Sequence, residues 1–310
     1  MLQRAIAAFL LAAVALAILG WFLTAPQPLS AAQLPSHAPD ASNGERIFHA
    51  AGCASCHAAP DAEGEDKLQL GGGLELTTDF GIFRVPNISP DPETGIGGWS
   101  TLDFANAVLR GVSPGGAHYY PAFPYSSYIR MRPEDVIDLK AFMDDLPAVS
   151  NQVAEHDLGS PYNIRRGVGL WKRLYLSSEP IAALPGASDV VQRGQYLAEG
   201  PGHCGECHTS RDWIGGVRTG LWLAGAPNPE GRGAIPNITP HDEGLAWSES
   251  EIVDVFKSGF TPDFDTLGGR MSDVQEELSH LPDEDLQAIA AYLKAVPPLP
   301  DAVPSSSDEE

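Results

Sequence analysis

Apolar residues form one unbroken run near the N-terminus and recur at helical spacing in two later parts of the chain. The run, residues 5–23, contains no charged residue, and a helix that spans a bilayer needs about 20 such residues. Arg4 precedes the run, and Trp21 stands near its end, where aromatic side chains meet a membrane surface. The pattern predicts an uncleaved signal-anchor helix within residues 1–25, with residues 24–310 exported.

The alternative is a secretory signal that is cleaved after Ala32, within Ser30-Ala31-Ala32. The apolar part of such a signal is about 7–15 residues long, which is shorter than this run. The length therefore favours the anchor. Both alternatives carry the rest of the chain across the membrane.

Each of the two later parts contains an amphipathic helix with a clear start and end. A serine and an acidic residue three positions later form a capping box, and a glycine ends the apolar stripe. These signals are Ser100, Asp103 and Gly111 in the first part, and Ser248, Glu251 and Gly259 in the second.

These helices belong to an internal duplication. Residues 44–57 resemble residues 194–208, residues 85–90 resemble 235–240, and residues 134–147 resemble 284–297. The duplication predicts a linker at 26–42, a first domain at 43–149, an intervening strap at 150–189 and a second domain at 190–298. The tail, residues 299–310, is predicted to be acidic and disordered.

The composition narrows the set of partners. The chain has 310 residues with 32 glycines and 27 prolines, which indicates helices joined by long turn-rich loops. Its formal net charge is −22 at pH 7. Such a chain is repelled by phosphate backbones, so we expect no nucleic-acid partner. The acidity is explained either by a partner with a basic docking face or by a solvated acidic surface alone.

All four cysteines fall in two matching pentapeptides. These are Cys53-Ala54-Ser55-Cys56-His57 and Cys204-Gly205-Glu206-Cys207-His208. The pattern C-x-x-C-H is the attachment signature of haem c, in which two thiols bond the porphyrin and the histidine binds the iron. The sequence therefore predicts two covalently bound haems, attached at Cys53, Cys56, Cys204 and Cys207, with His57 and His208 as proximal iron ligands.

Three other interpretations of the cysteines are weaker. A zinc site would place its Cys-x2-Cys pairs about 15–20 residues apart, whereas these pairs are separated by almost half the chain. A thioredoxin-like pair would need a βαβ context, which the surrounding pattern does not indicate. Two disulfides are possible in an exported protein, but they would not require a histidine after each pair.

The order of elements in each half resembles the class I cytochrome c fold. The phrase HYYPAFPYSSYIRM, residues 118–131, and the two PNI[ST]P phrases are similar to the cytochrome c subunits of bacterial membrane-bound dehydrogenases, closest to anchored diheme cytochromes. The resemblance implies a mainly α protein with two tandem cytochrome c domains. It also implies that Asn87, Asn237, Trp99 and Trp247 line the haem propionate edge. The alternative for the two tryptophans is that they fill the core.

A second axial ligand is expected for each haem of an electron carrier, and a methionine thioether raises the reduction potential. Met271 follows Gly268-Gly269-Arg270 in a predicted loop ahead of the last helix, and is the expected ligand of the second haem. In the first half, Met131 lies four residues before Asp135. Met131 is the favoured ligand there, His118 is the second choice, and an open iron is the third. Met143 is expected to be a core residue.

The resemblance implies a single-electron relay, not an enzyme. Its expected place is the outer face of the cytoplasmic membrane, with the haem domains in the periplasm. Its expected partners are a periplasmic dehydrogenase as donor and the respiratory chain or a soluble cytochrome as acceptor. The alternative is a peroxidase-like diheme enzyme with one reactive haem. The strap holds Arg165, Arg166, Lys172 and Arg173 among apolar residues. It is either an amphipathic segment on lipid or a partner, or a packed connection between the domains; the need to bury its apolar residues favours the second.

Overall fold

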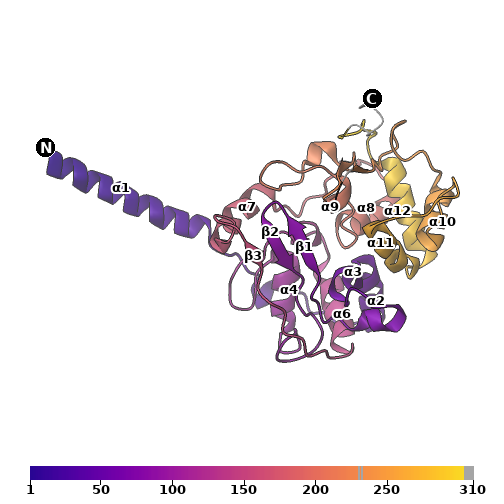
Figure 1. Ribbon diagram of the computed structural model, residues 1–310, viewed down its shortest axis with the longest axis horizontal. Coiled ribbons are helices and arrows are strands. Elements are labelled where there is room, and N and C mark those ends of the chain that lie inside the picture. Colours follow the sequence, from indigo (N-terminus) through magenta and orange to yellow (C-terminus); the bar gives the residue numbers. More distant parts are fainter. Residues whose placement is uncertain (230, 232, 304–310) are drawn as a thin grey trace.

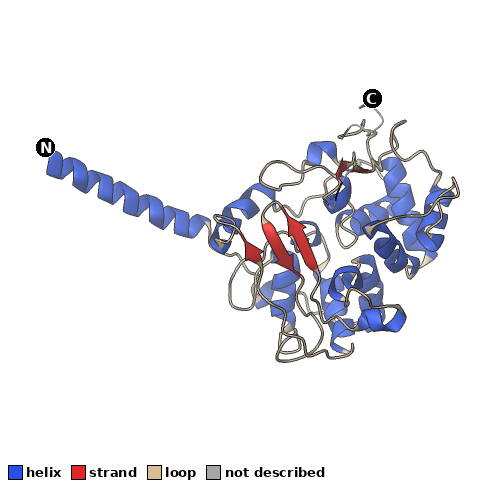
Figure 2. Cartoon of the chain, viewed as in Figure 1, coloured by secondary structure: helices blue, strands red, loops and turns tan. Residues whose placement is uncertain are grey.

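The computed structural model describes residues 1–229, 231 and 233–303, and Figure 1 shows how its elements are arranged. Helices dominate and the strands are short (Figure 2). The helix α1 (Leu2–Leu23) projects from the body as one straight rod with no buried residue. The sequence predicts a disordered tail at residues 299–310. Most of this tail, residues 304–310, lies outside the described residues.

The body consists of two halves joined by the strap. The linker contains η1 (Ala31–Gln33). The first half contains α2 (Ala41–Ala50), α3 (Cys53–His57), η2 (Gly64–Leu68), β1 (Glu75–Thr78), β2 (Gly81–Arg84), α4 (Thr101–Arg110), α5 (Tyr125–Tyr128) and α6 (Pro133–Asp144). The strap contains β3 (Asp157–Leu158), η3 (Arg165–Gly167) and α7 (Val168–Tyr175). The second half contains α8 (Asp189–Glu199), α9 (Gly205–His208), η4 (Thr219–Leu221), β4 (Ala226–Pro227), β5 (Ala234–Ile235), α10 (Glu249–Ser258), α11 (Arg270–Ser279) and α12 (Asp283–Ala295).

The predicted capped helices are confirmed as α4 and α10. Both capping boxes form, with Ser100 and Ser248 accepting from the backbone three residues on. Both helices end at glycines in the left-handed conformation, Gly111 at φ 58° and Gly259 at φ 75°. Glycine adopts this conformation without the cost that a Cβ would impose, so the helix ends are set locally.

The first and last helices of each half cross at a glycine. A Cβ on Gly44 of α2 would lie 2.1 Å from the carbonyl oxygen of Asp138 on α6. A Cβ on Gly194 of α8 would lie 1.8 Å from the carbonyl oxygen of Ala288 on α12. Only glycine permits backbones to approach so closely. The duplicated glycines therefore fix the same helix crossing in both halves.

Each half has its own buried core. The first core includes Phe48, Leu139, Tyr128 and Met131, and Met143 belongs to it as predicted. The second core consists of buried apolar residues from the corresponding elements of the second half: Leu197, Trp222, Ile252, Phe256, Leu286, Ile289, Tyr292 and Leu293. Burial of these side chains stabilises each half by about 1.5–3 kcal/mol per large apolar residue.

Two elements differ from the sequence expectation. The strap adds β3 to the antiparallel pair of β1 and β2, a contact with the first half that the sequence did not predict. Met271 lies in the first turn of α11 and not in a loop. Gly269 precedes this helix, and its carbonyl oxygen accepts a 2.6 Å hydrogen bond from the hydroxyl of Ser272. Residues with good helix propensity follow and continue the turn.

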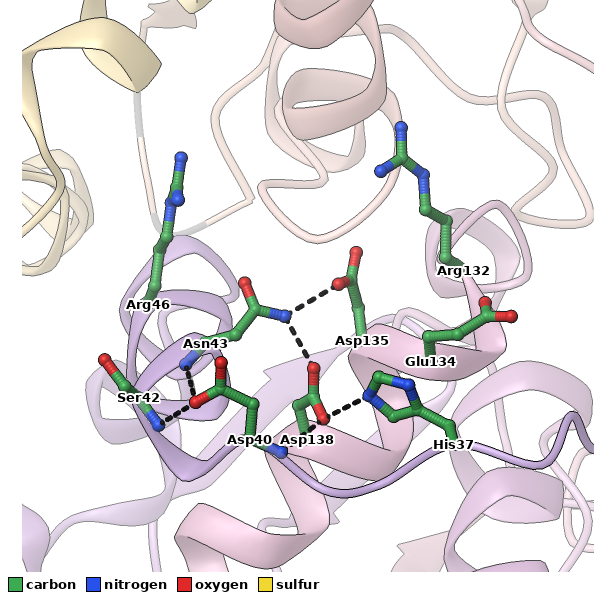
Figure 3. Close-up of a pocket in the computed structure, with 9 residues that line it drawn as sticks. All are labelled: His37, Asp40, Ser42, Asn43, Arg46, Arg132, Glu134, Asp135 and Asp138. Carbon is green, nitrogen blue, oxygen red and sulfur yellow. Dashed lines mark hydrogen bonds and ion pairs between the residues drawn. The ribbon is translucent and has the colours of Figure 1, made fainter.

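The linker is fixed to the first half by polar contacts around a pocket between α2 and α6 (Figure 3). His37 bonds the buried carboxylate of Asp138 at 2.7 Å, and the amide of Asn43 donates to both Asp138 and Asp135. Arg46 and Arg132 stand on opposite sides of the pocket (Figure 3). The lining residues are His37, Asp40, Ser42, Asn43, Arg46, Arg132, Glu134, Asp135 and Asp138. These contacts fix the end of the linker to α2 and α6.

Candidate haem sites

The two motif histidines are held in the same way. His57 ends α3, and its Nδ1 lies 2.8 Å from the carbonyl oxygen of Pro86; His208 ends α9, and its Nδ1 lies 2.8 Å from the carbonyl oxygen of Pro236. A carbonyl can only accept, so Nδ1 carries the proton and Nε2 is left with its lone pair. Fixing the ring through its other nitrogen is the usual arrangement for a histidine that binds a metal.

Burial lowers the pKa of both histidines, that of His57 to about 4. Both imidazoles are therefore neutral at pH 7, which is the form that coordinates iron. The two prolines come from the duplicated PNI[ST]P phrases, so the repeat positions the histidine through a backbone oxygen. The residues of both motifs fit the attachment of haem.

The four cysteines form no disulfide in the structure. Burial is the first cause that raises the pKa of each thiol, which reaches about 12 for Cys204. These cysteines are not the low-pKa thiolates of redox-active pairs.

Met131 lies in the buried core of the first half and is 4% exposed. The same core contains Ala54 of the first motif, and Cys53 packs against it. The chain turns directly after the methionine: Arg132 is extended, at φ −67° and ψ 135°, and Pro133 occupies the first turn of α6. Both conformations follow from the restrictions that proline imposes on itself and on the residue before it. The turn brings Met131 onto the core that adjoins the first motif.

Met271 lies at the edge of the core of the second half, on α11. It packs against the second core, as does Cys204 of the second motif. The helix α11, on which Met271 lies, also contacts the first half. The hydroxyl of Ser55 lies 3.4 Å from the carbonyl oxygen of Asp273.

His118 is placed elsewhere. Its Nε2 lies 2.9 Å from the carbonyl oxygen of Thr24, at the end of α1, and its pKa is lowered, first by burial. Lys172 and Arg166, both from the strap, are the nearest charges that lower it further. His118 therefore lies at the junction of α1 with the strap and contacts both.

The expected haem-edge residues have protein partners. The Nδ2 of Asn87 donates to the carbonyl oxygen of Val149 at 2.7 Å, and that of Asn237 donates to the carbonyl oxygen of Leu299 at 2.8 Å. Each asparagine thereby ties its loop to the end of its own half. Trp99 and Trp247 pack against the two cores, as the alternative interpretation of these residues expects.

The two motifs face one another across the junction of the halves. Arg270 of α11 lies close enough to both Cys56 and Cys207 to oppose, through its charge, the rise in their pKa that burial causes. The imidazole of His203 stands 5.6 Å from the ring of Tyr128 and 3.3 Å from the carbonyl oxygen of Ala51. Sequence analysis did not predict this arrangement.

Glu206, between the cysteines of the second motif, makes contacts that the sequence gave no reason to expect. Its Oε1 accepts from the hydroxyls of Ser126 and Ser127 at 2.8 and 2.9 Å, and Arg211 pairs with its other oxygen. Burial raises the pKa of Glu206, but Arg211 and the two serines outweigh it, and the pKa is lowered. A negative charge is therefore held within the second motif, in contact with the segment of the first half that leads to Met131.

Two C-x-x-C-H motifs with oriented histidines, each beside a methionine-containing core, define a c-type cytochrome with two haems. Residues 41–147 match the family described as cytochrome c, and residues 189–293 match the family described as cytochrome C oxidase, cbb3-type, subunit III. These matches confirm the predicted tandem cytochrome c domains in a mainly helical chain. The protein carries two covalently bound haem c groups.

Known relatives identify the family. A diheme cytochrome c-type protein of Cereibacter sphaeroides is 54% identical over 279 residues, which cover 90% of this chain and 93% of the relative. The chain belongs to the diheme c-type cytochromes.

More distant relatives are subunits of dehydrogenases. The cytochrome c subunit of a quinone alcohol dehydrogenase from Gluconobacter oxydans is 34% identical, over 94% of this chain and 63% of the relative. The cytochrome subunit of fructose dehydrogenase from Gluconobacter japonicus is 34% identical, over 88% of this chain and 55% of the relative. This chain therefore spans about half to two thirds of the length of these two subunits.

Proposed function

We propose that the protein relays single electrons through two six-coordinate haems. The iron ligands are His57 and Met131 in the first domain, and His208 and Met271 in the second. When bound, each haem takes up and releases one electron at its iron. The observation that carries the proposal is the matched placement of both histidines, each with Nδ1–H donated to a proline carbonyl and Nε2 left to coordinate.

The methionines exclude substrate from the remaining axial position and favour the ferrous state. Met131 and Met271 adjoin the cores on which Cys53 and Cys204 pack, which supports this assignment. His118 lies at the junction of α1 with the strap, where its Nε2 contacts Thr24, and this position supports Met131 as the ligand of the first haem. With both axial positions filled, the protein transfers electrons and does not act as an enzyme.

The haem domains are held at the outer face of the cytoplasmic membrane by α1, which is long and apolar enough to cross a bilayer. The segment after α1 is integrated into the fold, and this supports retention of the helix. The backbone N–H of Leu29 donates to the side chain of Asn106 at 2.6 Å. A Cβ on Gly169 would lie 2.4 Å from the carbonyl oxygen of Thr24. The absence of a side chain at position 169 therefore lets the backbone at Thr24 pack against α7. Cleavage after Ala32 would remove both contacts.

The donor is a periplasmic dehydrogenase, and the acceptor is the respiratory chain or a soluble cytochrome. The relatedness to cytochrome subunits of alcohol and fructose dehydrogenases supports this direction. The net charge of −22 suits a partner with a basic docking face.

The ligand assignment is tested with three single variants. Met271→Ala and Met131→Ala should each remove one share of the sulfur-to-iron charge-transfer absorption of the oxidised protein, and each should lower the potential of its own haem. His118→Ala is the control and should leave both unchanged. If His118→Ala alters the absorption and Met131→Ala does not, the first haem has a different ligand.

The competing function is a peroxidase-like enzyme with one open iron. Carbon monoxide distinguishes the two, because it binds ferrous iron with a free axial position. The electron-relay proposal expects no rapid binding to the reduced wild-type protein. Ready binding at one haem would favour the enzyme.

A further inference from the structure

The strap makes a mixed basic and apolar face beside the end of α1. Arg166, Leu170, Arg173 and Leu174 follow one another at helical spacing and lie on one side of η3 and α7. We call these four residues the strap face. Val168 and Lys172, on the other side of the same helix, are buried.

Both arginines of the strap face hold the end of α1. Arg166 donates to the carbonyl oxygen of Trp21 at 2.7 Å, and its guanidinium lies 4.1 Å from the centre of the Trp21 ring. Arg173 donates to the carbonyl oxygen of Leu23 at 2.5 Å. These carbonyls are among the last four of α1, which have no partner within the helix and attract cations.

The opposite side of the helix fixes α7 to the first domain. The Nζ of Lys172 donates to the carbonyl oxygens of Arg110 and Gly111, at 2.6 and 2.7 Å, and lies 4.4 Å from the centre of the Tyr125 ring. The strap face therefore cannot rotate inward to bury its apolar residues. It stays at the level where α1 leaves the body, as the position of α7 in Figure 1 shows.

The two leucines of the strap face are exposed among the residues that the structure describes. Leu170 is 48% exposed and Leu174 is 68% exposed, although leucine is normally buried. Residues 158–178 hold four basic and no acidic residues, in a chain with a net charge of −22. Trp213 is also exposed, on a loop that α7 holds through the bond from Trp171 Nε1 to the carbonyl oxygen of Ile214.

We propose that the strap face lies in the headgroup layer of the same membrane that α1 crosses, with Leu170 and Leu174 directed into the acyl boundary. This inference rests on the proposed anchoring by α1. Three observations favour lipid over a protein partner: continuity with the end of a membrane-length helix, local positive charge, and leucines exposed between the arginines. The second contact holds the haem domains at a fixed orientation to the membrane, which a single helix alone does not.

The proposal is tested with spin labels on the full-length holoprotein in vesicles of phosphatidylethanolamine and phosphatidylglycerol. The native cysteines carry haem, so each added cysteine is the reactive one. Labels are placed by Leu170→Cys, Leu174→Cys, Leu11→Cys in α1 and Val190→Cys on α8 of the second domain. Val190 is 51% exposed and is a control of matched exposure. The haem absorption spectrum reports that each variant is folded.

Collision with oxygen, which concentrates in lipid, is compared with collision with a water-soluble nickel complex. We expect labels at 170, 174 and 11 to favour oxygen, and the label at 190 to favour nickel. If 170 and 174 behave like 190 while 11 favours oxygen, the strap inference is wrong and the anchor stands. If the label at 11 also favours nickel, the anchor itself is wrong, and the inference that depends on it falls too.

Discussion

Arg46, on α2 of the first domain, donates a 2.5 Å hydrogen bond to the buried carboxylate of Asp285, on α12 of the second. Arg193 of the second domain donates to the same carboxylate at 2.8 and 2.9 Å. Asp285 therefore accepts hydrogen bonds from its own domain, through Arg193, and from the first domain, through Arg46. Because this charge is almost fully desolvated, its partners matter more than those of surface ion pairs.

Asp135 occupies the corresponding position of the first domain. It accepts from Asn43 of its own domain at 2.8 Å and from the hydroxyl of Tyr196 of the second domain. In the duplication, Asn43 corresponds to Arg193 and Arg46 corresponds to Tyr196. In both domains, the residue at the position of Asn43 and Arg193 bonds the aspartate of its own domain. The residue at the position of Arg46 and Tyr196 bonds the aspartate of the other domain.

Neutralising Asp285 should destabilise the protein more than neutralising Asp135. Asp285→Asn leaves Arg46 and Arg193 without their carboxylate, and loss of one partner of a buried ion pair costs about 3–5 kcal/mol. Asp135→Asn disturbs hydrogen bonds to uncharged partners, at a cost of about 1 kcal/mol. Denaturant unfolding, followed by far-UV circular dichroism, measures both. If both variants lose the same free energy of unfolding, the charge of Asp285 contributes no more to stability than the hydrogen bonds of Asp135.

Acid should weaken the junction of the domains. Burial raises the pKa of Asp285, but the two arginines outweigh it, and the folded-state pKa is lowered. The stabilisation is therefore present above the unfolded-state pKa of about 3.9, and is lost as pH falls through the lower folded-state pKa. We expect the free energy of unfolding to fall below about pH 4, and to fall less steeply in Asp285→Asn. The same slope in both proteins would assign the acid sensitivity to other groups.

Removing the second pair of cysteines should leave one haem. In the double variant Cys204→Ala, Cys207→Ala, the thioethers of the first domain remain, and these bonds survive denaturation and acid-acetone extraction. The intact mass under denaturing conditions should equal the chain plus one haem, and Cys53→Ala, Cys56→Ala should give the converse result. A wild-type mass with one haem or none would contradict attachment at both motifs.

Neutralising Glu206 should raise the potential of the second haem. A nearby negative charge favours ferric over ferrous iron, and its effect is larger where burial lowers the local dielectric constant. Glu206→Gln keeps the size of the side chain and an acceptor for Ser126 and Ser127. Glu249→Gln, on the exposed start of α10, is the control. The prediction is wrong if spectroelectrochemical titration shows no larger shift for Glu206→Gln than for the control.

Local signals predicted much of this structure. The capping serines, the glycines that end α4 and α10, and the turn at Pro133 all follow from the conformational preferences of a few adjacent residues. The cysteine motifs predicted the two haems for the same reason. The attachment chemistry is contained in five consecutive residues.

No local sequence pattern predicted the contacts at the junction of the domains. Arg46 and Asp285 are 239 residues apart in the chain, and neither has a neighbour that reveals the other. His203 has φ 39° where the first motif has Gly52 at φ 56°, and its identity gave no indication that it contacts Tyr128. The strand β3 and the contacts of Glu206 are equally non-local. They depend on how two domains pack, which periodicity within one domain does not specify.

The paired roles of Asp135 and Asp285 give the domain junction the geometry of an isologous interface. In such an interface, the same two surface patches meet reciprocally about a twofold axis. A single-domain precursor with this patch could associate with a second copy of itself as a homodimer. Gene duplication and fusion would then retain an existing contact instead of creating a new one. The present chain has Asn43 opposite Arg193 and Arg46 opposite Tyr196 in the repeat, so the two ends of its junction are chemically unlike.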